Sequence, residues 1–135
     1  MNLRHRVLRS SATVGVVAAL VLTLAAPAQA TQVFRVRPNT GPPGTGVHIR
    51  GSGLSVPPNA CSLAPFGLEF KDSAGMLTEW GTILVLGGAF RVHETIPADA
   101  ATGLGKVILL FAYHVRGFGC GIETVAQRGF SVTAS

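Results

Sequence analysis

Residues 41–54 read GPPGTGVHIRGSGL, and this stretch decides the fold. Prolines and glycines at its start form a turn, after which Val47 and Ile49 alternate with His48 and Arg50. Such alternation of apolar and polar residues is typical of a β-strand that buries one face. The stretch therefore predicts a tight turn followed by a strand whose valine and isoleucine point into a core.

The same alternation recurs along the chain after residue 31. Short apolar-polar runs are separated by clusters of Gly, Pro, Asn and Asp, and no long run has helical periodicity. Residues 72–75 and 87–88 are typical of hairpin turns. The longest apolar run, 107–113, is expected to be the central strand. We expect about seven strands in all: 32–37, 47–50, 66–71, 82–86, 90–96, 107–113 and 130–132.

Short strands at this spacing predict an all-β fold, a single antiparallel β-sandwich. A barrel is less favoured, because the strands are short and unevenly spaced. Residues 31–135 are about 105 residues long, which suits one domain and excludes a large multi-step enzyme.

The first thirty residues have the parts of an export signal. Arg4, Arg6 and Arg9 precede an uncharged apolar run of 15 residues, 12–26, and Ala28-Gln29-Ala30 supplies the small residues of a cleavage site. A membrane-spanning helix needs roughly 20 apolar residues. We therefore expect a cleavable signal peptide at 1–30 and a mature protein that is secreted, without membrane insertion after cleavage, and that can associate peripherally with the cell surface.

The chain has 11 Lys and Arg against 6 Asp and Glu, a net charge of +5. Removing Arg4, Arg6 and Arg9 leaves eight basic against six acidic residues, so the expected mature charge is only +2. A sequence-independent nucleic-acid binder carries a larger positive charge. We therefore expect no nucleic-acid partner.

Residues 41–54 resemble the opening of IPT/TIG-type immunoglobulin-like domains, whose pattern is G-x-x-G-T-x-V-x-I-x-G-x-G-F/L. Residues 88–92 and 96–103 are similar to the later half of secreted bacterial Ig-like modules. The resemblance implies an Ig-like sandwich that acts as a binding, spacer or adhesion module and not as a catalyst. Such modules are commonly found in tandem on larger surface proteins, whereas we expect a single domain here, and the two cysteines are not required by the pattern.

Cys61 and Cys120 are the only cysteines. In an exported chain an even cysteine count predicts a disulfide. A metal pair or a reactive thiol is the alternative, but neither cysteine has a nearby histidine or a second cysteine at metal spacing. Closing a loop of about 60 residues stabilises a fold by roughly 4 kcal/mol.

Other candidate chemistry has a simpler explanation at each position. His48 and His93 are expected on outward strand positions, where surface histidines are favoured over metal ligands because no ligand motif is present. Glu69, Asp72 and Glu79 could form a calcium corner, but without D-x-D spacing solvated turn charges are favoured. We expect no catalytic residues, no metal and no cofactor.

The most informative candidate site is residues 114–123, expected as a loop at one end of the sandwich held by Cys120. Loops of this kind are common binding sites, and Tyr, Phe and Arg are favoured at interfaces. In the alternative, Phe111 and Tyr113 belong to the strand and the following glycines simply turn the chain. Segment 57–66 should lie beside this loop and add an apolar wall. The candidate binding residues are Tyr113, His114, Arg116, Phe118, Leu63 and Phe66.

Two functions fit these features. The first is a non-catalytic Ig-like module that binds a protein or a cell-wall component, or has a structural role. The second is a carrier of a small apolar ligand, similar to antibiotic-binding chromoprotein sandwiches, although those typically have two disulfides. A deep cleft between 57–66 and 114–123 would favour the carrier.

Overall fold

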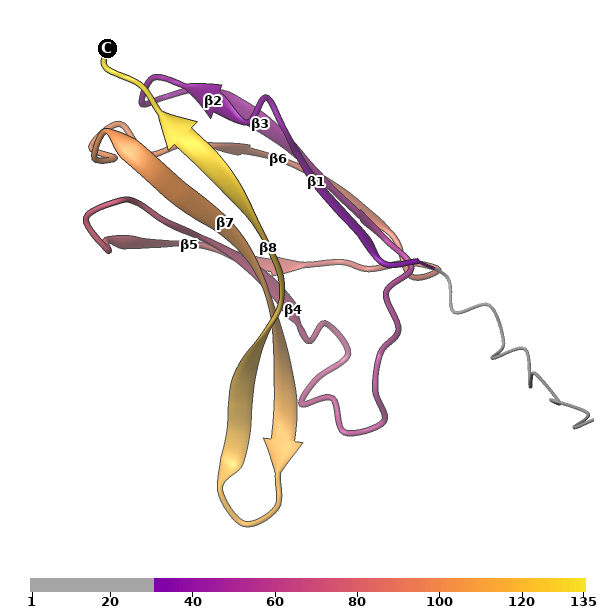
Figure 1. Ribbon diagram of the computed structural model, residues 1–135. Helices are drawn as coiled ribbons and strands as arrows, with labels where there is room; N and C mark the ends of the chain where they lie inside the picture. Colours follow the sequence, from indigo (N-terminus) through magenta and orange to yellow (C-terminus); the bar gives the residue numbers. More distant parts are fainter. Residues whose placement is uncertain (1–30) are drawn as a thin grey trace, which may run out of the picture.

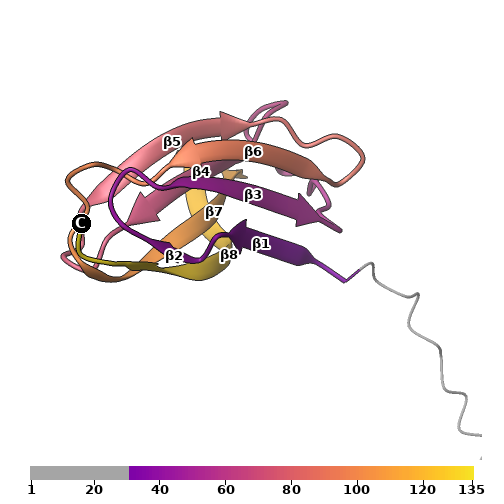
Figure 2. The ribbon, with the colours of Figure 1, turned by 90° about the horizontal axis from the view of Figure 1, so that it is seen from above.

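Apolar residues that alternate along the chain bring eight strands into two β-sheets in the computed structural model, which describes residues 31–135 (Figures 1 and 2). The expected all-β fold is confirmed, while the expected signal segment, 1–30, lies outside the described residues. One sheet contains, in spatial order, β1 (Val33–Arg37), β3 (Gly46–Ser52) and β6 (Phe90–Thr95). The other contains β2 (Thr40–Gly41), β8 (Gly119–Val132), β7 (Gly103–Val115), β4 (Phe66–Lys71) and β5 (Leu77–Ile83).

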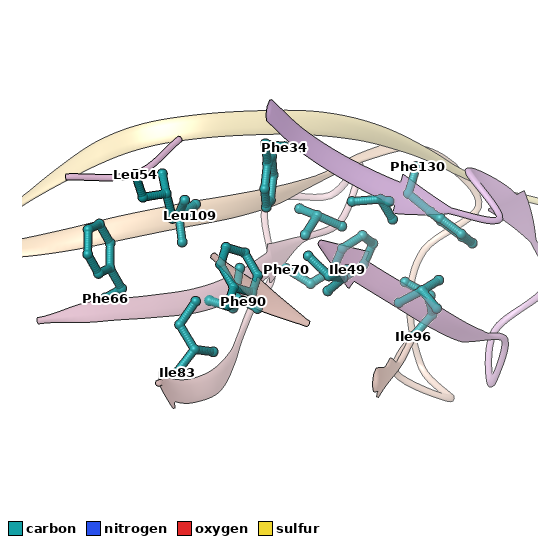
Figure 3. Close-up of a cluster of buried hydrophobic side chains, with 14 of the residues drawn as sticks. Phe34, Ile49, Leu54, Phe66, Phe70, Ile83, Phe90, Ile96, Leu109 and Phe130 are labelled. Carbon is teal, nitrogen blue, oxygen red and sulfur yellow. The ribbon is translucent and has the colours of Figure 1, made fainter. Parts of the chain in front are cut away.

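The core lies between the two sheets, and its side chains come from alternate strand positions (Figure 3). Val47 and Ile49 of β3 are fully buried, as the alternation predicts. From the five-stranded sheet, Phe70 packs edge-on against Phe130 with ring centroids 6.3 Å apart. Trp80 of β5 stacks on the same ring at 5.8 Å. The aromatic rings therefore fill the space between the two sheets.

Strand β7 lies at the centre of the five-stranded sheet, between β8 and β4, as the apolar run predicts. Its residues Val107, Leu109 and Phe111 are buried in the core. All strand pairs are antiparallel except one: the two-residue strand β2 runs parallel to β8, with Thr40 opposite Ser131. Strand β2 follows β1 in the chain, so the three-stranded sheet is connected through it to the edge of the five-stranded sheet.

The strand expected at 82–86 is shifted towards the N-terminus. Strand β5 ends at Ile83, and the side chains of Leu84 and Leu86 are exposed. An apolar run alone does not show burial, and here it continues from the strand into a connection. The expected turn at Gly87–Gly88 is confirmed, because Leu86 and Ala89 exchange two backbone hydrogen bonds of 2.9 and 3.1 Å around it.

The C-terminal strand is much longer than the expected 130–132. Strand β8 begins at Gly119 and pairs with β7 along its whole length, so residues 114–123 form a hairpin instead of a loop. Figure 1 shows this hairpin extending past the three-stranded sheet. Most of its β8 residues are exposed on both faces, which removes the alternation that would reveal a strand.

Gly51 of β3 shows why a glycine is needed inside a core strand. It lies opposite Phe90 of β6, and a Cβ atom at Gly51 would collide with the Phe90 ring. Phe90 is buried and lies against Phe34, with ring centroids 6.3 Å apart. The ring therefore occupies the space that a side chain at position 51 would take.

We expect Gly51→Ala to destabilise the fold by roughly 1–3 kcal/mol, because the Phe90 ring must shift inside a packed core. Denaturant unfolding measures the change. Gly67→Ala is the matched control: it also lies in a strand, and its Cβ would meet only the Gly81 carbonyl at 3.4 Å. Equal losses in the two variants would contradict the steric explanation.

Candidate functional site

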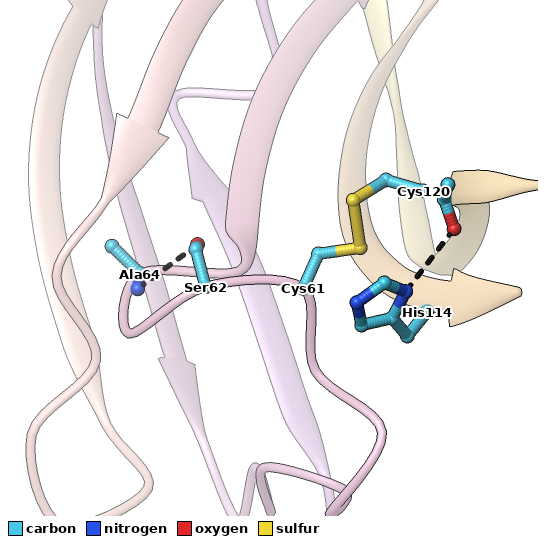
Figure 4. Close-up of a disulfide and its surroundings, with 6 residues drawn as sticks. Cys61, Ser62, Ala64, His114 and Cys120 are labelled. Atoms are coloured by element: carbon cyan, nitrogen blue, oxygen red, sulfur yellow. Dashed lines mark hydrogen bonds between the residues drawn. A yellow bond between two sulfur atoms is a disulfide. The ribbon is translucent and has the colours of Figure 1, made fainter. Parts of the chain in front are cut away.

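A disulfide joins the two segments that the sequence singled out. Cys61 lies in the connection between β3 and β4, and Cys120 lies at the start of β8. Their sulfur atoms are bonded, with Cα atoms 6.0 Å apart (Figure 4). The predicted pairing is confirmed, so neither sulfur is a free thiol.

Backbone hydrogen bonds hold the same two segments together. Strand β4 pairs with β7 only as far as Phe111. Beyond it, the amide of Cys61 donates to the carbonyl of Ala112 (3.0 Å), and the amide of His114 donates to the carbonyl of Asn59 (2.6 Å). The connection therefore continues along the edge of β7 that β4 leaves open, and segment 57–66 lies beside the hairpin as expected.

Four of the six candidate binding residues are exposed at this end. The side chains of Leu63 and Phe118, each close in sequence to a disulfide cysteine, are 104% and 87% exposed. Arg116 is exposed in the hairpin turn. The exposed ring of His114 donates from Nδ1 to the carbonyl of Gly119 at 3.3 Å, which orients it along the hairpin (Figure 4).

The other two candidate residues face the interior. Phe66 is only 2% exposed, and its ring lies 5.3 Å from that of Phe111 in the core, although the residue also lines the apolar hollow described below. It is the first inward residue of β4, and the alternation of that strand carries it into the core. Tyr113 is half-buried, and its ring lies over Gly121 in the space that a side chain at position 121 would occupy.

An apolar hollow of about 310 Å³ opens on the five-stranded sheet next to this end. Leu110, Ala112 and Ile122 line it, and Gly67 and Gly81 leave room on the neighbouring strands. Ile122 is 67% exposed although it is apolar. This surface is not evident from the sequence, because Ile122 lies opposite Ala112 only through the register in which β8 pairs with β7.

The three acidic residues of the possible calcium corner do not act together. Glu69 and Glu79 are register partners on β4 and β5 and line one part of the hollow. Asp72 is buried, so its interpretation as a solvated turn charge is wrong. In the part of the chain that the structure describes, no three His, Cys, Asp or Glu side chains form a possible metal site.

The carboxylate of Asp72 ties two connections together. It accepts hydrogen bonds from the amides of Ala74 and Met76 (both 2.9 Å) in the β4–β5 turn, and from the amide of Ala101 (3.1 Å) before β7. These bonds, the one from Ala101 most of all, lower the pKa of the Asp72 carboxyl below its ordinary range, and burial opposes them. Asp72 is therefore a hydrogen-bond acceptor that stabilises the fold by holding these two connections together.

The two strand histidines lie side by side on the three-stranded sheet. His48 and His93 are register partners with ring centroids 4.6 Å apart, and both side chains are exposed. They lie on the three-stranded sheet, whereas Cys120 lies on the five-stranded sheet, and they have no third ligand-type neighbour within residues 31–135.

Residues 31–135 contain no helix long and apolar enough to cross a membrane. Comparison with protein-family models finds no match to this chain, and comparison with curated proteins finds no significant similarity. The IPT/TIG resemblance therefore depends on residues 41–54 themselves, and the similarity to secreted bacterial Ig-like modules depends on residues 88–92 and 96–103.

Because folding lowers the pKa of Asp72, its contribution to stability is present at neutral pH and is lost as the pH falls through the folded-state pKa. We expect Asp72→Asn to lower the unfolding midpoint at pH 7 and to converge with the wild type at strongly acidic pH. Urea unfolding at several pH values measures this. Asp99→Asn, an exposed position in the β6–β7 connection that also contains Ala101, is the control and should show no comparable effect. A gap between wild type and Asp72→Asn that widens in acid would contradict the assignment.

Replacing both Cys61 and Cys120 by Ser should cost roughly 2–5 kcal/mol of unfolding free energy, because a loop with a sequence separation of 59 is no longer closed in the unfolded chain. The connection around Cys61 should also become sensitive to limited proteolysis. Denaturant unfolding and mapping of the first cleavage sites provide the two measurements.

The matched control for this pair is Ser55→Ala, an exposed position in the same connection that leaves the disulfide intact. It should retain wild-type stability and protease resistance. Two free thiols in the native wild-type protein, found by alkylation and mass spectrometry, would contradict the disulfide directly.

Proposed function

We propose that this protein is an exported, non-catalytic immunoglobulin-like module that binds a protein or a cell-wall component through its disulfide-braced end. The disulfide-braced end consists of segment 57–66 and the 114–123 hairpin, which the Cys61–Cys120 disulfide joins. The observation that carries the proposal is the exposure of three large apolar side chains there: Leu63, Phe118 and Ile122. Large apolar side chains left exposed at one end of a domain are candidates for contact with a partner. Bracing them before binding reduces the entropy that is lost when a partner docks.

The IPT/TIG-type assignment is supported by where the resembling residues lie. Residues 41–54 span the end of β2 and all of β3, residues 88–92 reach into β6, and residues 96–103 form the connection from β6 to the start of β7. All three therefore fall on strands or strand connections of a two-sheet β-fold, as the family pattern implies. The absence of a nucleophile motif in the sequence supports a non-catalytic role.

Export is supported by the signal-like residues 1–30, with Thr31 as the first residue of the mature protein. The Cys61–Cys120 disulfide is compatible with an extracellular location, because disulfides persist in oxidising compartments. The partner should therefore be another extracellular molecule or a component of the cell surface.

A carrier of a small apolar ligand is the second candidate function, because the hollow beside Leu110 and Ile122 has mostly apolar walls. Its volume of about 310 Å³ is at the lower end of the size range of ligand pockets. Leu63 and Phe118, the most exposed apolar side chains, do not line it. Partner binding uses these two side chains and is therefore the preferred function.

The test is a double substitution, Leu63→Ser with Phe118→Ser, followed by co-sedimentation with isolated cell-wall material and affinity capture from the proteins of the culture medium. We expect at least one of these interactions in the wild type and about a tenfold weaker one in the variant, the size typical of losing central apolar contacts. Leu77→Ser with Leu104→Ser is the control, because these side chains are also exposed but lie away from the disulfide.

The two candidate functions predict different results for a variant that fills the hollow. Ala112→Phe should leave partner binding in place if Leu63 and Phe118 carry it, and should remove a bound ligand if the protein is a carrier. Solvent extraction and mass spectrometry of the native protein measure the bound ligand. A co-purifying small molecule that is lost in Ala112→Phe, without any partner binding, would favour the carrier.

A further inference from the structure

The outward face of the three-stranded sheet carries four of the eight Lys and Arg residues of residues 31–135. In the register of the sheet, Arg35 of β1 lies opposite Arg50 of β3, and Arg50 lies opposite Arg91 of β6. The next outward row contains Arg37, then two histidines. We call this surface the arginine face, and its six exposed side chains are Arg35, Arg37, His48, Arg50, Arg91 and His93.

The β-sheet fixes the spacing of these groups. Neighbouring strands are about 4.8 Å apart, and successive outward residues along one strand are separated by about 7 Å. The face therefore presents a regular grid of cationic groups. Two shallow hollows, of about 460 and 350 Å³, lie over the grid, and Arg35, Arg50 and Arg91 line both.

No side-chain carboxylate from residues 31–135 compensates this charge. Glu94 is the only acidic residue on the three strands, and it lies opposite buried Val47, at an inward position of β6. The remaining acidic residues are on the five-stranded sheet or in connections: Glu69, Asp72, Glu79, Asp99 and Glu123.

This arrangement costs stability. Like charges directly opposite each other on neighbouring strands repel, and Arg50 has such a neighbour on each side. The core contacts of these strands come from the inward residues, so the outward arginines are not needed for packing. A concentration of uncompensated charge of this kind is expected where it attracts a ligand of opposite sign.

The chemistry of the face points to a phosphate-bearing ligand. The guanidinium group matches phosphate with paired hydrogen bonds. None of the exposed large apolar side chains of residues 31–135 lies on β1, β3 or β6, so the face has nothing to insert into a lipid bilayer. Phe, Tyr and Trp, the large rings on which bases stack in single-strand binders, are absent from its outward positions, and His48 and His93 are the only aromatic side chains there.

We propose that the arginine face binds a linear polymer of repeating phosphate groups that lacks bases. Four arginines on one flat surface can contact several phosphates of an extended chain at once. Binding of such a polyanion releases counterions, so the affinity should fall steeply with salt, with a log–log slope of about −3 for four contacts. This surface is separate from the disulfide-braced end, so the proposal does not depend on the proposed function.

The test uses medium-chain inorganic polyphosphate as the probe, with affinities measured at several salt concentrations. The variant Arg50→Gln with Arg91→Gln should bind roughly tenfold more weakly, because two charge-assisted contacts are lost. Its salt slope should fall to about half of the wild-type value. Lys71→Gln with Lys106→Gln is the matched control. These two lysines are outward-facing register partners on the five-stranded sheet, and their replacement changes the net charge by the same amount.

A second readout separates binding from a structural role. Because Arg50 is repelled by two neighbours, Arg50→Gln should raise the thermal unfolding midpoint slightly while it weakens polyphosphate binding. A purely structural arginine would lower the midpoint. A fall of the midpoint together with loss of binding would therefore overturn the proposal.

Comparison ligands identify the class of polymer. Equal losses in the arginine and lysine variants would show non-specific attraction and overturn the assignment to this face. Tighter binding to single-stranded DNA, or to phosphatidylserine vesicles, than to polyphosphate would overturn the assignment to a base-free phosphate polymer. Preference for polyphosphate over polyglutamate, abolished in the arginine variant alone, is the result that we expect.

Discussion

The pairing of β7 is the constraint on which the rest of the structure depends. Along β8 it extends over the whole of β7, from Gly103 to Val115, but along β4 it extends only from Lys106 to Phe111. The part of β7 that pairs with both neighbours buries its inward side chains in the core. The part beyond Phe111 has lost one neighbouring strand and the opposing sheet. An isolated two-stranded ribbon is at best marginally stable in water, so this end needs support from elsewhere in the chain.

The connection between β3 and β4 supplies that support. Its residues Asn59 and Cys61 make backbone hydrogen bonds to the free edge of β7, and the disulfide fixes the contact. The expected stabilisation of roughly 4 kcal/mol from the cross-link compares with a total of about 5–15 kcal/mol for a typical domain. A covalent brace of this size lets Leu63 and Phe118 remain exposed without collapsing into a core, because the backbone beneath them is held without their help.

The parts of the fold that bury one face were predictable, and the parts that do not were missed. Alternation located β1, β3, β4 and β6 because each has a core side and a solvent side. The first half of β8 is exposed on both sides and has no such signal. The closeness of Phe66 in sequence to Cys61 predicts a place in the site, whereas its alternation with Leu68 and Phe70 predicts the burial that its side chain has.

The register between strands was the other feature that could not be predicted from the sequence. The outward direction of Arg35 and Arg37 follows from the alternation, but their neighbours across the sheet come from strands far away in sequence. The small net charge of residues 31–135 averages over both sheets and therefore hides a face that is uniformly basic. Whole-chain charge excludes a partner only when the charges are evenly spread, and here the outward face of the three-stranded sheet carries arginines but no acidic residue.

The separation of the charged residues between the two sheets gives their outward faces different binding properties. Inward residues of both sheets share one core, so outward residues can change on one sheet with little effect on the other, as expected for sites without common contacts. The three-stranded sheet uses this freedom for charge, and the five-stranded sheet uses it for an apolar hollow beside the braced hairpin. A module that holds a polymer on one surface and a partner at another would raise the effective concentration of each for the other. Such coupling needs no conformational change, because it follows from joining the two surfaces rigidly through a common core.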